Sequence, residues 1–278
     1  MMNDRQEIKQ MHEITTQNRR LDFLVEAFKA ESEEYSDLPV PCDTEGKQRL
    51  LRSLMNIRMP GSIPEEVLHV QDEYLTDRAA EKGIVRLSDI PEIKEGLSIW
   101  QGDITRLSCD AIVNAANTQM LGCFIPMHTC IDNCIHTYAG VQMRAECSSQ
   151  MAALRDKYGK DYEQPVGVPL ITDAYNLPCR KVIHVAGPIV RHELTPVLEH
   201  DLADCYANSL ELCLQNGLKS VAFCCISTGL FRFPNRRAAE IAVQTVTEWL
   251  KDHPGWMERV IFNVFKDQDR RIYEELLS

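Results

Sequence analysis

Residues 114–136 read NAANTQMLGCFIPMHTCIDNCIH and bring soft metal ligands, an imidazole, a carboxylate and several amides into one short segment. Within this segment Cys123, His128 and Cys130 form a C-x4-H-x-C cluster. A glycine precedes the cluster and a proline interrupts it, which favours a tight loop over a continuous helix. Two thiolates and one imidazole suit zinc, and neither calcium nor magnesium. The segment therefore predicts a loop that folds around one zinc ion per chain.

The number of ligands separates two kinds of zinc site. Three protein ligands leave the fourth position open, as in catalytic sites, whereas structural sites are usually closed by four. The alternative is a structural site that Cys134, His136 or Cys147 closes. A second alternative has no metal at all, only small buried thiols and a chance histidine. His184, on a predicted strand, is expected to be a hydrogen-bonded core residue.

The composition is that of a globular protein with one large domain, or one domain plus an extension. The chain has 278 residues, 44% of them hydrophobic and 26% charged, and no apolar run long enough to span a bilayer. The charged N-terminus lacks the apolar region of a secretory signal, so a cytoplasmic location and eleven reduced cysteines are expected. A net charge of −11 argues against broad nucleic-acid binding but permits a small anionic ligand.

Residues 1–83 are predicted to form an α-helical extension. Apolar side chains recur there at spacings of three and four residues, and a further helix is expected over 64–82, ending at Gly83. The extension carries no metal or nucleotide motif, so it is interpreted as a docking cap, with substrate recognition as the alternative. The periodic residues are Ile8, Met11, Ile14, Leu21, Leu24, Val25, Phe28, Leu50, Leu51, Leu54 and Met55.

From residue 84 onward, strand patterns alternate with helix patterns, and continuous apolar strands suit a sheet covered on both faces. The expected fold class is a three-layer α/β/α sandwich. The expected strands are 84–87, 97–101, 111–114, 168–174, 181–186, 220–226 and 260–264. The expected helices are 131–138, 141–158, 197–216, 236–251 and 268–277.

A turn that contains glycine follows the strand expected at 220–226 and reads STGLFRFP over residues 227–234. Such a turn at the carboxyl end of a strand presents backbone N–H groups to phosphate, although an ordinary connection is the alternative. P-loop and G-x-G-x-x-G motifs are missing from the sequence, which argues against a P-loop ATPase and a dinucleotide dehydrogenase. Arg232, Arg236 and Arg237 are candidates for local positive charge; the alternative is that they are solvated helix residues.

Five motifs occur in the order and approximate spacing of the macrodomain fold. They are QGDIT at 101–105, NAAN at 114–117, CIH at 134–136, IHVAGP at 183–188 and STGLF at 227–231. The resemblance is strongest to bacterial zinc-dependent macrodomains of the sirtuin-linked group, which are MacroD-like protein-ADP-ribose hydrolases. It implies a macrodomain with a central mixed sheet over residues 84–278. Residues 121–130 depart from the glycine-rich catalytic loop of MacroD-type enzymes, because they carry the metal cluster instead.

The resemblance also implies roles in ADP-ribose binding. Asp103 is expected to accept a hydrogen bond from the adenine amino group, Ile104 to offer the adjoining backbone amide, and Phe265 to pack against adenine. The loop expected to wrap the diphosphate consists of Ser227, Thr228, Gly229, Leu230 and Phe231, with Phe231 near the distal ribose.

At the reacting end, the resemblance implies that Asn117 contacts the distal ribose and that Asp132 activates or positions the attacking water. Zinc would either lower the pKa of a bound water or orient substrate oxygens, and the sequence leaves both open. A zinc nucleoside deaminase is disfavoured, because the required H-x-E and C-x-x-C motifs do not occur.

The expected function is removal of mono-ADP-ribose from modified protein side chains by a zinc-dependent hydrolase. The alternative is a macrodomain that only binds ADP-ribose and has a structural zinc. By resemblance alone, a sirtuin-type ADP-ribosyltransferase and a lipoyl-carrier protein are expected partners.

Overall fold

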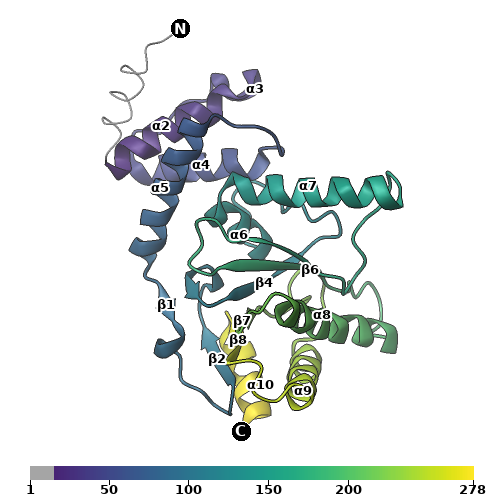
Figure 1. Ribbon diagram of the computed structural model, residues 1–278. Helices are drawn as coiled ribbons and strands as arrows, with labels where there is room; N and C mark the ends of the chain where they lie inside the picture. The colour runs from purple at the N-terminus through teal and green to yellow at the C-terminus, as the bar shows by residue number, and fades with distance from the viewer. Residues whose placement is uncertain (1–15) are drawn as a thin grey trace.

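The computed structural model describes residues 16–278, and its centre is a six-stranded sheet (Figure 1). The strand order is β2-β8-β7-β4-β6-β5, and β5 alone runs antiparallel to its neighbour. The expected mixed sheet is therefore confirmed. The strands are β2 (Leu97–Gln101), β4 (Ala111–Ala116), β5 (Leu170–Asp173), β6 (Lys181–Ala186), β7 (Ser220–Phe223) and β8 (Arg259–Val264).

Helices cover both faces of the sheet, as expected for three layers. Helices α6 (Ile131–Ala139) and α7 (Val141–Tyr158) connect β4 to β5 in one direction across the sheet. Helices α8 (Pro196–Gln215) and α9 (Asn235–Asp252) connect β6 to β7 and β7 to β8 in the opposite direction. Right-handed crossovers place these two pairs on opposite faces (Figure 1). The last helix, α10 (Asp267–Leu277), packs against α9.

Five of the seven expected strands differ from the observed ones by one or more residues at their ends, and two of these differences affect the topology or the site. The strand expected at 220–226 ends at Phe223, although Ile226 is fully buried. Its apolar run continues past the last ladder pair because residues 224–226 fill the core while the chain turns away from the sheet. The segment expected at 84–87 forms β1 (Val85–Arg86), which pairs with β3 (Leu107–Ser108) outside the main sheet.

Within residues 16–278, four helices precede the sheet, and their apolar side chains pack together. Leu21, Leu24, Val25 and Phe28 of α2 are buried in this core, as their spacing predicts, whereas Ile8, Met11 and Ile14 lie outside the described residues. Val141 of α7 belongs to the same cluster, so the helices are docked on the sheet domain, and the division at residue 83 stays a prediction. The helices are α2 (Gln17–Ala30), α3 (Glu33–Ser36), α4 (Thr44–Ile57) and α5 (Glu65–Lys82).

Two expectations drawn from composition can be compared with the structure. All eleven cysteines are free thiols, as expected for a chain without a disulfide framework. Within residues 16–278, every helix is too short or too polar to traverse a lipid bilayer.

A buried histidine lies on β6, the strand next to the edge strand β5. His184 of β6 is fully buried, and its Nε2 lies 3.0 Å from Thr172 Oγ1 of β5. Its Nδ1 lies 3.0 Å from Nδ2 of Asn114 on β4. Because the Asn114 amide nitrogen is a donor, Nδ1 accepts and Nε2 carries the proton of a neutral imidazole. His184 is therefore the hydrogen-bonded core residue that was expected, and burial lowers its pKa to about 4.

This shift in pKa makes folding stability depend on pH. The unfolded chain takes up the proton near pH 6.5, whereas the folded chain resists it down to about 4, so stability is lost as pH falls through this window. Between pH 7 and pH 5 we expect His184 to account for a loss of about 2 kcal/mol. Urea unfolding of wild type and His184→Gln at both pH values should show a loss that is larger in wild type by about this amount, because His136 and Asp132 titrate in both proteins. Equal losses in the two proteins would contradict the assignment.

Candidate functional site

The three predicted metal ligands meet in the loop between β4 and α6. The donor atoms of Cys123, His128 and Cys130 all lie within 4.8 Å of one another, and Cys123 Sγ lies 3.4 Å from His128 Nδ1. Two sulfurs and one imidazole nitrogen at this spacing fit a single zinc ion. Burial raises the pKa of the Cys130 thiol to about 12, so a cation is needed to favour its thiolate at neutral pH.

None of the expected candidates adds a fourth protein ligand to this group. His136 and Cys147 lie with His184 in a second, fully buried group, and Cys134 Sγ lies 3.6 Å from Arg52 Nη2. The second group is a polar core cluster, because both ring nitrogens of His184 already have partners. Within residues 16–278 the loop thus offers three ligands, the number typical of an open site.

A buried asparagine organises the backbone of this loop. Asn133 of α6 is fully buried, and its Nδ2 donates to the carbonyl oxygens of Cys123 (3.3 Å) and Ile125 (3.0 Å). Its own backbone N–H donates to Cys130 Sγ at 3.4 Å, which makes a predicted metal ligand the N-cap of α6. Asn133 was not singled out from the sequence, since an asparagine inside a helix has no distinctive spacing.

The start of the loop is constrained by Gly122 and Asn117. Gly122 has a φ of +81°, and a Cβ there would lie 2.8 Å from the ring of His136, so only glycine fits. Asn117 Nδ2 donates to the Gly122 carbonyl at 3.1 Å, while its Oδ1 accepts from Gln119 N at 3.0 Å. Asn117 is half-buried at the carboxyl end of β4, beside the metal loop.

Asp132 lies in the first turn of α6 and accepts a hydrogen bond from a residue of the sheet. It is 5% exposed, and its Oδ1 accepts from Asn114 Nδ2 at 2.7 Å and lies 3.6 Å from His136 Nε2. Burial raises its pKa to about 6, so the carboxylate form is available at neutral pH. Asn114 thus links Asp132 to His184. The sequence did not predict this contact of Asn114, although a polar side chain within an otherwise apolar strand was a signal for it.

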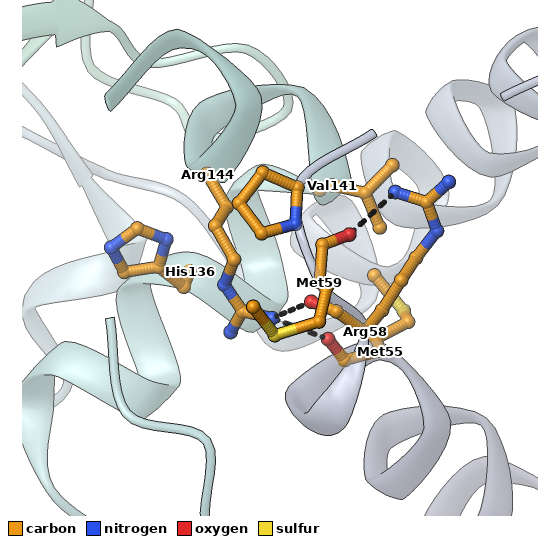
Figure 2. Close-up of a pocket in the computed structure, with 8 residues that line it drawn as sticks. Met55, Arg58, Met59, His136, Val141 and Arg144 are labelled. Carbon is orange, nitrogen blue, oxygen red and sulfur yellow. Dashed lines mark hydrogen bonds between the residues drawn. The ribbon is translucent and has the colours of Figure 1, made fainter. Parts of the chain in front are cut away.

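Arg144 of α7 is a second residue beside the metal loop that no sequence motif predicted. Its buried guanidinium lies 4.3 Å from the centre of the Phe124 ring in the metal loop. It also donates to the carbonyl oxygens of Met55 and Arg58 at the end of α4, as Figure 2 shows. Burial lowers its pKa to about 10. The cavity beside it is about 10 Å³, which is far too small for a nucleotide.

Asp103 and Phe265 lie beyond the carboxyl ends of the adjacent strands β2 and β8. Asp103 Oδ1 accepts from Thr105 N at 3.0 Å, and Oδ2 lies 3.2 Å from Lys82 Nζ of α5. Burial raises the pKa of Asp103, but the hydrogen bonds of Thr105 and the charge of Lys82 outweigh it, so the pKa is lowered. Ile104 follows in a buried turn, and the ring of Phe265 is 76% exposed.

The loop at 227–231 continues from the end of β7. Ser227 has a φ of +64°, and a Cβ on the neighbouring Gly187 would lie 2.2 Å from its Oγ. The Phe231 carbonyl accepts from Val190 N at 2.9 Å, which ties this loop to the segment after β6. In the described chain, the backbone N–H groups of Gly229, Leu230 and Phe231 have no acceptor. These exposed donors suit an anionic ligand.

Two of the three candidate arginines are paired with carboxylates. Arg236 pairs with Glu275, and Arg237 pairs with Glu199 at 2.6 Å and with Glu240 at 3.1 Å. These two therefore fit the alternative of surface helix residues, because nearby carboxylates offset their charge. Arg232 is exposed, with no ion pair to any residue in the described part of the chain.

The sequence-predicted residues thus gather at one edge of the sheet. Asp103 follows β2, the metal loop follows β4, residues 227–231 follow β7 and Phe265 follows β8. These four strands are parallel, so their carboxyl ends share an edge, which is where ligands bind in open α/β sheets.

Comparisons with known proteins agree with this geometry. Residues 113–242 match the Macro domain family. The chain is 45% identical over 267 residues to a "Protein-ADP-ribose hydrolase" of Treponema medium, covering 95% of this chain and 100% of that protein. A protein of the same name from Staphylococcus aureus strain MRSA252 is 42% identical over 270 residues, covering 96% and 98%.

Solved structures give the same result. The Trypanosoma brucei macrodomain in complex with ADP-ribose superposes with a TM-score of 0.63 at 26% identity, covering 82% of this chain and 95% of that one. The two relatives extend across almost the whole chain, including the helices before the sheet. The chain belongs to the macrodomain family.

Proposed function

We propose that this protein is a zinc-dependent hydrolase that binds ADP-ribose and removes mono-ADP-ribose from modified protein side chains. The observation that carries the proposal is a three-ligand metal loop directly followed by the buried carboxylate of Asp132, at the strand edge that also holds Asp103 and residues 227–231. The names of the relatives from Treponema and Staphylococcus and the ADP-ribose in the Trypanosoma structure support it.

Each end of ADP-ribose has a matching group along this edge. The ionised Asp103 accepts a hydrogen bond from the adenine amino group, and the exposed ring of Phe265 offers an apolar face for the base. The unpaired N–H groups of residues 229–231 donate to the diphosphate, so the protein binds an anion despite a net charge of −11. The distal ribose then lies toward Asn117 and the metal loop.

Hydrolysis requires attack of water on the anomeric carbon of the distal ribose through an oxocarbenium-like state. Asp132, as a carboxylate, accepts a proton from this water, and the hydrogen bond from Asn114 fixes the direction of its oxygens. Asn117 orients the ribose. A zinc ion held by Cys123, His128 and Cys130 would supply Lewis-acid chemistry beside this carboxylate.

The second candidate is a macrodomain that binds ADP-ribose without hydrolysis. It is favoured by the burial of Asp132, which is 5% exposed and already hydrogen-bonded to Asn114. Tight binding of ADP-ribose with no release from a modified protein in the presence of zinc would select this candidate. A sirtuin-type transferase and a lipoyl carrier as partners stay predictions of the resemblance.

Removing the metal should remove activity. We expect the zinc-loaded wild type to release ADP-ribose from an automodified transferase, a chelator to reduce the rate by at least about tenfold, and added zinc to restore it. Cys123→Ala should lose both bound zinc, measured by metal analysis, and activity. Cys42→Ala, which changes an exposed cysteine outside the loop, should match wild type. A metal-free wild type as active as the zinc form would refute zinc dependence.

Asp132→Ala should separate turnover from binding. Loss of a general base typically lowers the rate by roughly 10²–10⁴-fold, and we expect kcat to fall within this range. The dissociation constant for ADP-ribose, measured by calorimetry, should change little because the adenine and diphosphate contacts lie elsewhere. Failure of the variant to bind ADP-ribose would mean that Asp132 shapes the pocket instead of acting on water.

A further inference from the structure

Helix α4, in the N-terminal part of the chain, contacts the backbone of the metal loop through two polar side chains. Arg52 Nη2 donates to the carbonyl oxygen of the ligand His128 at 2.7 Å and to Asn133 Oδ1 at 3.0 Å. The sequence separation between Arg52 and these partners is 76 and 81 residues. The guanidinium therefore connects α4 to a zinc ligand and to the asparagine that organises the loop.

Asn56 makes the second connection, one turn further along α4. Its side chain is 1% exposed; Oδ1 accepts from Met127 N at 3.0 Å, and Nδ2 donates to Thr137 Oγ1 at 2.8 Å. Met127 has a φ of +57°, a left-handed conformation that is unfavourable for a residue with a Cβ. The hydrogen bond from its N–H thus holds an unfavourable turn directly before the ligand His128.

These contacts are more specific than docking requires. Apolar packing already joins the helices to α7, and burying an amide and a guanidinium is costly unless each finds partners. Here both side chains reach polar groups of the loop or of α6, and none of the contacted loop atoms is a metal donor. The two side chains therefore orient the loop backbone and do not coordinate the metal.

We infer that Asn56 and Arg52 are positioning residues for the metal centre, which hold residues 123–130 in the ligating conformation and thereby set the affinity for zinc. A loop that must be ordered on binding pays the entropy of ordering from its binding free energy, whereas a loop ordered beforehand does not. The inference rests on the proposed function, in that the loop binds zinc. It gives the N-terminal helices a role in the metal centre beyond that of a cap.

The test compares the zinc affinity of four full-length proteins by competition with a chromophoric chelator. Asn56→Leu leaves the Met127 N–H without its acceptor, and Arg52→Met removes the bond to the His128 carbonyl. We expect the dissociation constant for zinc to rise about tenfold in each, as for loss of one buried hydrogen bond. Ser53→Ala is the control on the same helix and should match wild type, because among residues 16–278 the Ser53 hydroxyl bonds only to Arg49 O.

Three further measurements separate the possible outcomes. Circular dichroism and the dissociation constant for ADP-ribose should be unchanged in all variants, which excludes general unfolding. In wild type, zinc should slow amide hydrogen exchange in residues 44–57, because coupling between α4 and the metal is reciprocal. If wild type binds zinc but the variants bind it equally well, or if zinc leaves exchange in α4 unchanged, this inference fails while the proposed function stands. If wild type binds no zinc, both fail.

Discussion

The hydrogen bonds of the Asn133 side chain are the interaction on which the rest of the site depends. This fully buried amide donates to the carbonyl oxygens of Cys123 and Ile125 and accepts from Arg52, so that it joins α6, the metal loop and α4. A short irregular loop cannot satisfy its own backbone polar groups, and leaving them unpaired in a buried place is costly. The Asn133 side-chain amide has two N–H donors and an oxygen with two lone pairs, so it provides hydrogen-bond partners for several of these backbone groups.

A second polar network connects the sheet to the site. Thr172 and His184 belong to the sheet. Asn114 is hydrogen-bonded both to His184 and to Asp132 at the start of α6, and so connects the two residues. The two networks meet on the same helix, one through Asp132 and the other through Asn133. The proposed reactive carboxylate and the metal loop are therefore positioned by separate parts of the fold, the sheet on one side and the N-terminal helices on the other.

The proposed ligand site would allow a strongly acidic chain to bind an anion. Arg236 and Arg237 are neutralised by glutamates, so positive side chains are not the main attraction. In the proposed site, backbone N–H groups of the loop after β7 attract the anion, and they carry no net charge that would disturb the rest of the surface. A residue also has two functions at α6, where the proposed ligand Cys130 is the helix cap.

The sequence by itself determined the three layers and the C-x4-H-x-C cluster, because periodicity and ligand spacing are local properties, whereas the mixed sheet was implied by the family resemblance. The buried face of α2 and the convergence of Cys123, His128 and Cys130 both follow from such spacing. Only the tertiary structure decided that His136 and Cys147 group with His184 and not with the three ligands of the loop, and that β7 ends at Phe223. It also revealed the contacts of Asn56, Asn133 and Arg144. A buried polar residue is defined by its partners, and those of Asn56 and Arg144 lie more than seventy residues away, beyond the reach of any local pattern.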